Sequence, residues 1–266
     1  MVTNMTIYEM ASFNIRFDNP ADGENSWECR KEHVLGMMAH YRWDVVGLQE
    51  ARGNQLRFLS ELDDYGTEGA SRDHDPESEH SPIFYKKSVF DKEDGGTFWL
   101  SQTPDVPSKS WGSDCMRICT WVRLKDMRNG KRLLFMNTHL DHISEEARYR
   151  GALMILDWIE QYAVGLPVVL TGDFNASPEE RCYKEIIKRL TDTRRVADAN
   201  HYGPWGTFAD FRYDIPWSEL KEIDYIFADK VKVLRTRAVT DSFDRKYPSD
   251  HFPITATLEI TDHKGD

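Results

Sequence analysis

Polar residues that could bind a metal ion or transfer a proton follow the ends of several apolar stretches. They form six short clusters: Asn14-Ile15-Arg16, Gln49-Glu50, Asn137-Thr138-His139, Gly172-Asp173-Phe174-Asn175, Asp224 and Ser249-Asp250-His251. Side chains at strand ends can converge on one mouth of a sheet-based domain. Each cluster alone is common as a solvated strand end or a turn. Their combination indicates a functional site.

The residue types in these clusters suit phosphoester hydrolysis with a metal ion held by oxygen ligands. Glu50, Asp173 and Asp250 offer hard anionic oxygens, and Asn14 and Asn175 add neutral ones. The expected cofactor is therefore Mg²⁺ or Mn²⁺. Zinc is disfavoured, because its sites need more His or Cys residues at fixed spacing than this chain offers.

Charge and composition restrict the class of protein. The chain has 266 residues, with 34 Lys and Arg against 45 Asp and Glu, which gives a net charge of −11. An acidic protein repels polyphosphates at long range, so a phosphate substrate must be attracted by a local basic cluster or by divalent cations. Hydrophobic residues make up 40% of the chain, which excludes global disorder.

The sequence contains neither an apolar run long enough to span a membrane nor a signal-peptide pattern in residues 1–10. We expect an unanchored protein, either cytoplasmic or, if a signal peptide has been removed, periplasmic or secreted. The four cysteines lack Cys-x-x-Cys spacing and are expected to be buried structural thiols: Cys29, Cys115, Cys119 and Cys182.

The elements that must position these clusters alternate between short apolar strands and helical patterns. No linker divides the chain, so we expect a single domain over residues 1–266 with a core of about 6–260. Strands are predicted at 7–15, 44–48, 117–124, 132–138, 167–170, 223–227 and 252–260, and helices at 29–41, 144–163 and 178–190. Asn129-Gly130 predicts a hairpin turn, and Ser144 a helix cap. The charged segment 71–80 is typical of a solvated loop.

Six motifs resemble the endonuclease/exonuclease/phosphatase superfamily, which includes DNase I, exonuclease III, deadenylases, inositol polyphosphate 5-phosphatases and neutral sphingomyelinases. They are FNIR (13–16), LQE (48–50), NTHLDH (137–142), GDFN (172–175), IDYIF (223–227) and SDHFP (249–253), and they span nearly the whole chain. The resemblance implies an α/β (α+β) fold of the DNase I type. This fold is a four-layer α/β/β/α sandwich, with two mixed β-sheets packed face to face and helices outside.

The resemblance also implies roles for the residues around the metal ion. Glu50 would bind the divalent cation with help from Asn14 and Asp250. Asp173 and Asn175 would lie near the attacking water. The implied reaction is a one-step, in-line attack of water on phosphorus.

Two histidines receive roles from the same resemblance. His251 would pair with the carboxylate of Asp224, which fixes the tautomer of the ring and stabilises its protonated form. His139 would face the scissile phosphate and donate a hydrogen bond or assist the leaving group. Either Asp173 or His251 could accept the proton of the water. We favour Asp173 as the base and His251 as its electrostatic partner.

Arg16, Arg117 and His142 are the candidates for substrate binding. Arg16 follows Asn14 as in DNase I-like members, where exonuclease III-like members have an acidic residue. Arg117 lies in an Arg-x-x-Thr-Trp segment, where relatives place an arginine that faces phosphate. His142 follows the NTHLDH strand and could flank the pocket. For the aromatic residues Trp99, Trp111, Trp205 and Phe208, packing is favoured over base stacking.

The leading interpretation is a metal-dependent phosphoester hydrolase of a nucleic-acid end, a nucleotide or a small phosphodiester. The alternative is a phosphatase or phosphodiesterase of a small sugar or lipid-like phosphoester. Duplex binding is disfavoured because the sequence has no long Lys/Arg cluster. A catalytically inactive binding module is disfavoured because the five residues that the chemistry needs are all present: Glu50, Asp173, Asp224, Asp250 and His251. No protein partner is implied, and a monomer is expected.

Overall fold

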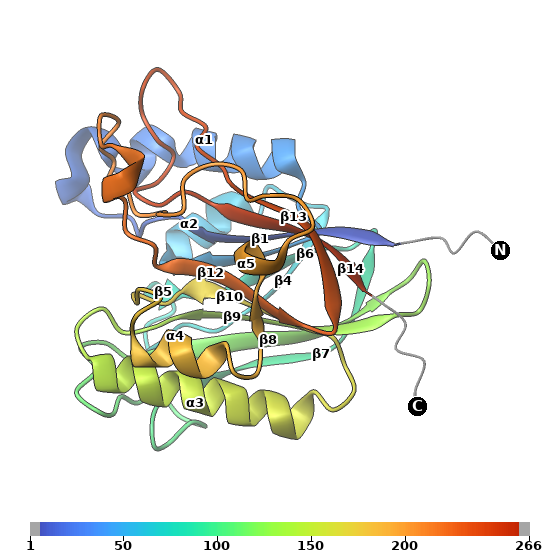
Figure 1. Cartoon of the computed structure of the whole chain (residues 1–266). Coiled ribbons are helices and arrows are strands. Elements are labelled where there is room, and N and C mark those ends of the chain that lie inside the picture. Colours follow the sequence, from blue (N-terminus) through green and yellow to red (C-terminus); the bar gives the residue numbers. More distant parts are fainter. Residues whose placement is uncertain (1–5, 261–266) are drawn as a thin grey trace.

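Fourteen β-strands and seven helical segments make up residues 6–260, the part of the chain that this computed structural model describes (Figure 1). The strands are β1 (Ile7–Asn14), β2 (Val45–Gln49), β3 (Ala51–Arg52), β4 (Tyr65–Glu68), β5 (Glu79–His80), β6 (Ile83–Lys86), β7 (Phe90–Trp99), β8 (Ile118–Asp126), β9 (Arg132–His139), β10 (Val168–Asp173), β11 (Thr191–Asp192), β12 (Asp224–Asp229), β13 (Val231–Ala238) and β14 (Ile254–Ile260). The helices are η1 (Pro20–Asn25), α1 (Trp27–Tyr41), α2 (Gly53–Leu59), α3 (Glu145–Tyr162), α4 (Arg181–Ile186), α5 (Thr193–Val196) and η2 (Trp217–Glu219).

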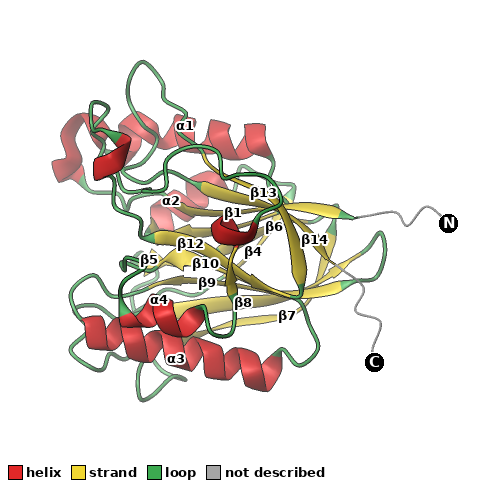
Figure 2. Cartoon of the chain, viewed as in Figure 1, coloured by secondary structure: helices red, strands yellow, loops and turns green. Residues whose placement is uncertain are grey.

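Two mixed sheets lie face to face in the centre of the molecule (Figure 2). The first sheet has the strand order β13-β14-β1-β2-β6-β4, and the second has the order β11-β12-β10-β9-β8-β7. Each sheet contains one parallel pair, β1 with β2 and β9 with β10, among antiparallel neighbours. Helices α1 and α2 cover the outside of the first sheet, and α3 and α4 cover the second (Figure 1). The four-layer sandwich expected from the sequence is confirmed.

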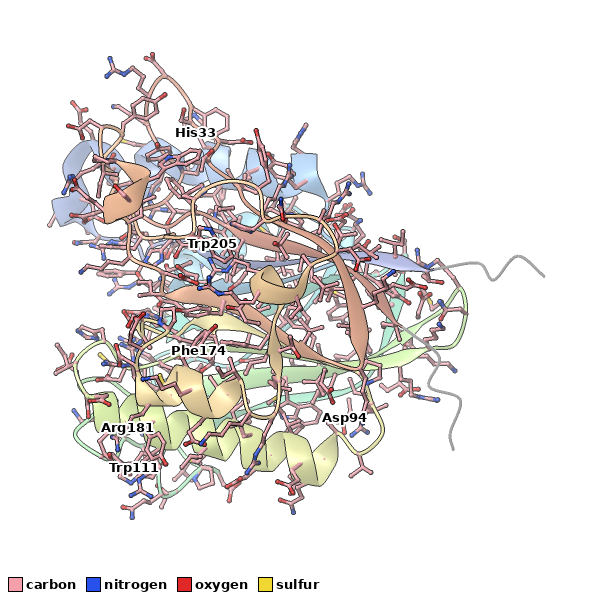
Figure 3. The ribbon with its side chains drawn as sticks, in the orientation of Figure 1. His33, Asp94, Trp111, Phe174, Arg181 and Trp205 are labelled. Carbon is pink, nitrogen blue, oxygen red and sulfur yellow. The ribbon has the colours of Figure 1, made fainter. Side chains whose placement is uncertain are left out.

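Apolar side chains fill all three interfaces between these layers. Tyr8, Phe135 and Leu258 belong to the core between the sheets. Trp27 and Met38 pack between α1 and the first sheet. A third core lies between the second sheet and α3 and α4, and Phe174 in Figure 3 belongs to it. Burial on both faces explains why β2 and β10 are continuous apolar runs in the sequence.

Local signals account for most of the element boundaries. The Ser144 side chain accepts a hydrogen bond from the Ala147 backbone and caps α3, as expected. Gly130 adopts a positive φ in the turn between β8 and β9, as the Asn-Gly pair predicted. The predicted helix at 178–190 is shorter, because the chain turns after α4 into β11, which pairs with β12.

Two other expectations need correction. Cys119 and Cys182 are buried, but Cys29 is exposed and Cys115 is partly exposed, so only two of the four thiols are core residues. The segment 71–80 is not wholly a solvated loop, because its end forms β5 and pairs with β3 directly after Glu50. Within residues 6–260, no helix is long and apolar enough to cross a membrane.

The strand directions bring the six polar clusters to one edge of the sandwich. Strands β1, β2, β9 and β10 all end there, and Asp224 at the start of β12 is the register partner of Asp173 at the end of β10. The loop before β14 joins this edge, since the Ser249 hydroxyl donates a 2.7 Å hydrogen bond to the Asn14 carbonyl. The convergence expected from the sequence therefore follows from the topology.

A buried polar contact joins the two sheets directly behind this edge. The side chain of Gln49 on the first sheet donates a 2.6 Å hydrogen bond to Asn137 Oδ1 on the second, and Asn137 Nδ2 donates back to the Leu48 carbonyl. The sheets approach so closely here that a Cβ atom on Gly47 would lie 2.4 Å from Thr171 Oγ1. Glycine at position 47 thus allows the two halves of the edge to meet.

Candidate active site

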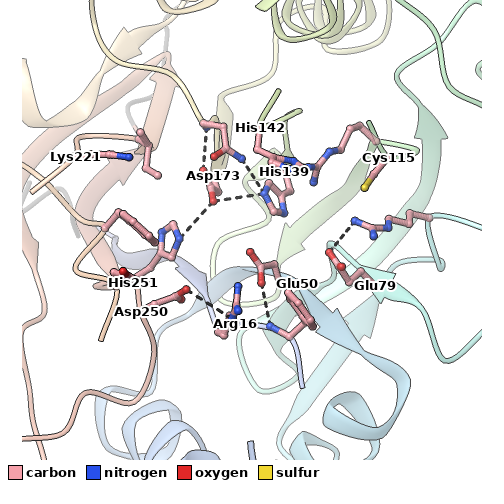
Figure 4. Close-up of a pocket in the computed structure, with 17 residues that line it drawn as sticks. Arg16, Glu50, Glu79, Cys115, His139, His142, Asp173, Lys221, Asp250 and His251 are labelled. Carbon is pink, nitrogen blue, oxygen red and sulfur yellow. Dashed lines mark hydrogen bonds and ion pairs between the residues drawn. The ribbon is translucent and has the colours of Figure 1, made fainter. Parts of the chain in front are cut away.

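A pocket of about 600 Å³ opens at the edge where the strands end (Figure 4). Nine of the eleven residues predicted for the site line it: Arg16, Glu50, Arg117, His139, His142, Asp173, Asn175, Asp250 and His251. The other two, Asn14 and Asp224, lie behind the pocket and hydrogen-bond to residues that line it. The sequence motifs therefore converge on one cavity of the size that small-molecule sites have.

Glu50 lies just after β2 and has the positive φ of 64° that turns its side chain into the pocket. Its Oε1 accepts a 2.9 Å hydrogen bond from Asn14 Nδ2, and its Oε2 accepts a 3.0 Å bond from the Phe17 backbone. The ligand atoms of Glu50, His139 and Asp173 all lie within 4.8 Å of one another. Groups at this spacing could hold a divalent cation, and Glu50 and Asp250, the carboxylates expected from the sequence to bind it, both line the pocket.

Asn14 connects the acidic groups of the site. Its Nδ2 lies 2.9 Å from Glu50, 3.0 Å from Asp173 Oδ2 and 3.5 Å from His251 Nε2. The amide oxygen, which was expected to serve a metal, accepts a hydrogen bond from the Arg16 backbone. In this arrangement, the Asn14 amide nitrogen orients the two carboxylates, and its amide oxygen is hydrogen-bonded to the Arg16 backbone.

Asp173 is a buried carboxyl with an unusual acidity. Burial raises its pKa to about 7, and the charge of Asp224 adds to this effect against the opposing His251. Its Oδ1 accepts a 2.9 Å hydrogen bond from the Asn175 backbone, and its Oδ2 lies 3.7 Å from His251 Nε2. A carboxyl that titrates near neutral pH can accept a proton from water and release it again.

His251 forms the pair with Asp224 that the sequence predicted. Its Nδ1 lies 2.8 Å from Asp224 Oδ2, and this oxygen also accepts a hydrogen bond from the Thr207 hydroxyl. Burial opposes a charge on the ring, but Asp224 and Asp173 outweigh it and raise the pKa of His251 well above its ordinary value. His251 is therefore an imidazolium beside the carboxyl of Asp173.

His139 has the opposite character from His251. Burial and the nearby positive charges of Arg117 and Arg72 hold its pKa well below the ordinary value, so the ring is neutral. Its Nε2 accepts a 3.0 Å hydrogen bond from Asn175 Nδ2 and lies 3.5 Å from Asp173 Oδ2. Hydrogen-bond donation from His139 to a phosphate stays a prediction, because this nitrogen is an acceptor here.

The three residues predicted to bind substrate lie on two sides of the pocket. The Arg16 guanidinium makes two 3.0 Å hydrogen bonds to Asp22 and lies 3.8 Å from Asp250. On the other side, Arg117 Nη2 lies 2.9 Å from His142 Nδ1. Both arginines contact other side chains of this chain, and both still line the cavity.

Several residues of the pocket were not predicted from the sequence. Arg72 and Glu79 line it, although they belong to the segment predicted to be a solvated loop. Cys115 and Lys221 also line it. A helical residue, Arg30, lies beneath the site and donates to backbone carbonyls on both sides, including those of Ile15 and Pro248. No local pattern distinguishes these residues from ordinary surface charges.

Comparison with known proteins identifies the fold and the family. The model of the Endonuclease/Exonuclease/phosphatase family matches residues 11–251. A structure of an endonuclease/exonuclease/phosphatase from Bacteroides vulgatus is 36% identical, with a TM-score of 0.91, and covers 96% of this chain and 100% of its own. The structure of the mannosyl-6-phosphatase Bt3783 of Bacteroides thetaiotaomicron is 34% identical, with a TM-score of 0.87, and covers 94% of this chain and 99% of its own.

A more distant curated relative is Nocturnin of Drosophila melanogaster, which is 24% identical over 291 residues. The match covers 88% of this chain but 42% of the Drosophila protein. Enzymes of this family hydrolyse phosphoesters and generally depend on a divalent metal ion, which agrees with the acidic and histidine groups around the pocket. This chain belongs to the endonuclease/exonuclease/phosphatase family.

Proposed function

We propose that this protein is an Mg²⁺- or Mn²⁺-dependent phosphatase of a small phosphomonoester whose leaving group is a sugar or a similar polyhydroxylated molecule. This proposal places the alternative from the sequence analysis ahead of nucleic-acid ends and nucleotides. The observation that carries it is the lining of the pocket, which offers many polar groups and no open aromatic face.

Both aromatic rings of the pocket are already covered by other side chains. The Phe17 ring lies under the guanidinium groups of Arg16 and Arg52, at 4.4 and 5.0 Å from its centroid. The Phe208 ring meets the His251 ring edge-on, with a centroid distance of 5.0 Å, and Lys221 Nζ lies over its face at 5.6 Å from the centroid. Trp205 does not line the pocket; it is exposed and packs under Arg195. A nucleotide base would therefore find no platform for stacking here.

The distribution of charge supports a small anionic substrate. Arg16, Arg117 and Lys221 line the pocket, and Arg72 lines it as an ion pair with Glu79, while the whole chain carries −11. A local cluster of this kind attracts one phosphate group without the extended basic track that a nucleic-acid strand requires. The likeness to a mannosyl-6-phosphatase at 34% identity points to the same class of substrate.

In the proposed reaction, Glu50 would hold the cation together with Asp250, and Asn14 would orient Glu50. When bound, the cation would neutralise charge on the phosphoryl oxygens and on the leaving alkoxide. Asp173 accepts a proton from the attacking water, and the His251 imidazolium donates a hydrogen bond to a phosphoryl oxygen. The products are inorganic phosphate and the free alcohol.

The test is hydrolysis of a substrate panel by the full chain with Mg²⁺, Mn²⁺ or EDTA. The panel contains hexose 6-phosphates, p-nitrophenyl phosphate, bis-p-nitrophenyl phosphate, nucleoside monophosphates, and single-stranded DNA and RNA. We expect EDTA-sensitive turnover that is fastest with hexose phosphates and is lost in Glu50→Ala and His251→Ala. Faster turnover of nucleotides or nucleic acid would overturn the proposed substrate class.

A further inference from the structure

Glu79, labelled in Figure 4, forms an ion pair with Arg72, and both residues line the pocket. Arg72 Nη1 donates a 2.8 Å hydrogen bond to Glu79 Oε2, and the two side chains are 18% and 12% exposed. Within residues 6–260, this is the one hydrogen bond between their charged groups and any side chain. Glu79 Oε1 and two nitrogens of Arg72 thus remain available on a wall that faces the cavity.

The segment that carries the pair is held in place by other contacts. The Arg72 backbone donates to the Glu79 carbonyl at 2.9 Å, and Trp99 Nε1 donates to the Arg72 carbonyl at 2.7 Å. Ser78 Oγ donates to Asp73 at 2.6 Å within the same segment. The loop therefore does not depend on the Arg72–Glu79 side-chain contact for its shape, and the two side chains are presented to the pocket.

The chemistry of the pair differs from that of the phosphate-facing side of the pocket. A guanidinium and a carboxylate together carry no net charge, so the pair has little attraction for a phosphate group. It does offer adjacent donors and an acceptor, which match hydroxyl groups because a hydroxyl both donates and accepts. Arg72 and Glu79 line the same cavity as His139, so groups bound to the pair would lie near the histidine side of the site.

We infer that Arg72 and Glu79 are specificity residues that bind neighbouring hydroxyl groups of the leaving group. This inference rests on the proposed function and deepens it, because it names the part of the pocket that recognises the sugar. A negative charge at Glu79 would repel a second phosphate group bound at this wall. The pair should therefore select monophosphorylated, hydroxyl-rich molecules over bisphosphates and over alcohols without hydroxyl neighbours.

The test compares Glu79→Gln and Arg72→Met with a matched control pair in the same region. Arg57 and Glu77 also form an ion pair, with a 2.9 Å contact, but their side chains are 64% and 51% exposed to solvent. The measured quantity is the ratio of kcat/KM for a hexose 6-phosphate to kcat/KM for p-nitrophenyl phosphate, which has no hydroxyl groups on its leaving group. We expect this ratio to fall about 10- to 100-fold in each test variant, mostly through KM. Arg57→Met and Glu77→Gln should leave it unchanged.

Two outcomes would overturn the inference. An equal loss on both substrates would mean that the pair acts on the phosphate or on the fold, and no loss on either would mean that it makes no substrate contact. Binding of the free hexose, measured by saturation-transfer NMR on the full chain and on Glu79→Gln, separates this inference from the proposed function. Wild-type binding that weakens in Glu79→Gln would uphold it even if no phosphomonoester is hydrolysed. If no phosphomonoester is hydrolysed and the wild type does not bind free hexose, both the proposed function and this inference are overturned.

Discussion

One oxygen of Asp224 serves two partners, since Oδ2 lies 2.8 Å from His251 Nδ1 and also accepts a hydrogen bond from the Thr207 hydroxyl. The other ring nitrogen of His251, Nε2, lies 3.7 Å from Asp173 Oδ2. Because all three groups are buried, the orientation of His251 depends on Asp224 and not on solvent. Catalysis by His251 should therefore be sensitive to Asp224.

Asp224→Asn should lower kcat for p-nitrophenyl phosphate by about 10²- to 10⁴-fold, because the imidazolium loses the charge that stabilises it. Thr207→Val removes the other hydrogen bond to the same oxygen and should cost less than about 10-fold. Steady-state kinetics with saturating Mg²⁺ measure both effects. A kcat of Asp224→Asn within twofold of wild type would rule out this role for the pair.

Glu50→Gln should weaken divalent cation binding by at least about 100-fold while the fold is kept. The amide can keep one of the two hydrogen bonds that Glu50 accepts, but it lacks the negative charge. Isothermal titration with Mn²⁺ measures the affinity without substrate, and Glu77→Gln on the surface is the control. Unchanged affinity in Glu50→Gln would mean that the cation binds elsewhere.

Without a divalent cation, the contribution of Asp173 and His251 to stability should fall as pH rises from about 5 to 8. The folded chain raises the pKa of Asp173 to about 7 and that of His251 above its ordinary value, so these two groups bind more protons in the folded state in this range. Burial lowers the pKa values of His139, His80 and His201, which opposes this contribution. Proton binding by the folded state stabilises it toward low pH. Melting temperatures in EDTA measure this slope, which should flatten with Mg²⁺ and in Asp173→Asn. The same pH slope in wild type and in Asp173→Asn would contradict the assignment.

Asp141→Asn should lower the free energy of unfolding by about 1 to 2 kcal/mol at pH 7. The lower value applies if nearby solvent screens the charge of the carboxylate. Burial disfavours the Asp141 carboxylate, but hydrogen bonds from Ser144 and Ser113 and the charge of Arg117 outweigh it and lower its pKa to about 2. This contribution is present above about pH 4 and is lost as pH falls toward 2. Urea unfolding at pH 7 and pH 3 measures the difference. The control variant Asp157→Asn, at a solvent-exposed position, should show no loss of stability relative to wild type at either pH.

Arg30→Met should both destabilise the fold and weaken cation binding, because this buried guanidinium ties the loop after β1 to the loop before Asp250. It donates to the carbonyls of Ile15 and Pro248, among others. The expected loss is about 2 to 4 kcal/mol of unfolding free energy. Arg30→Lys should recover part of the stability but not the affinity, since one ammonium cannot reach carbonyls on both loops. Lys31→Met, on the neighbouring surface, is the control.

The fold and most of the site could be predicted from the sequence because their signals are local. Buried strands such as β2 and β10 are apolar runs, and the polar residues that follow them mark the edge where strands end. This pattern predicts Asn14, Glu50 and Asp173 as site residues. The order of the six motifs along the chain indicates the endonuclease/exonuclease/phosphatase family. Strand direction then makes their convergence a consequence of topology.

The remaining features depend on contacts between segments that are distant in the sequence. Arg72 and Glu79 lie in a charged segment that looks solvated until β5 pairs with β3 and turns it toward the pocket. The pKa values of His139 and His251 differ because burial, helped by Arg117 and Arg72, lowers the first, whereas Asp224 and Asp173 outweigh burial and raise the second. Residue type alone carries neither piece of information.

The position of Asn14 has a kinetic consequence for folding. Its Nδ2 contacts Glu50, Asp173 and His251, which are 36, 159 and 237 residues away along the chain. Contacts that close such long loops form late, after both sheets have paired and packed. A cation that needs this assembled constellation cannot speed the search for it. We therefore expect Mg²⁺ to slow unfolding and to leave the refolding rate nearly unchanged.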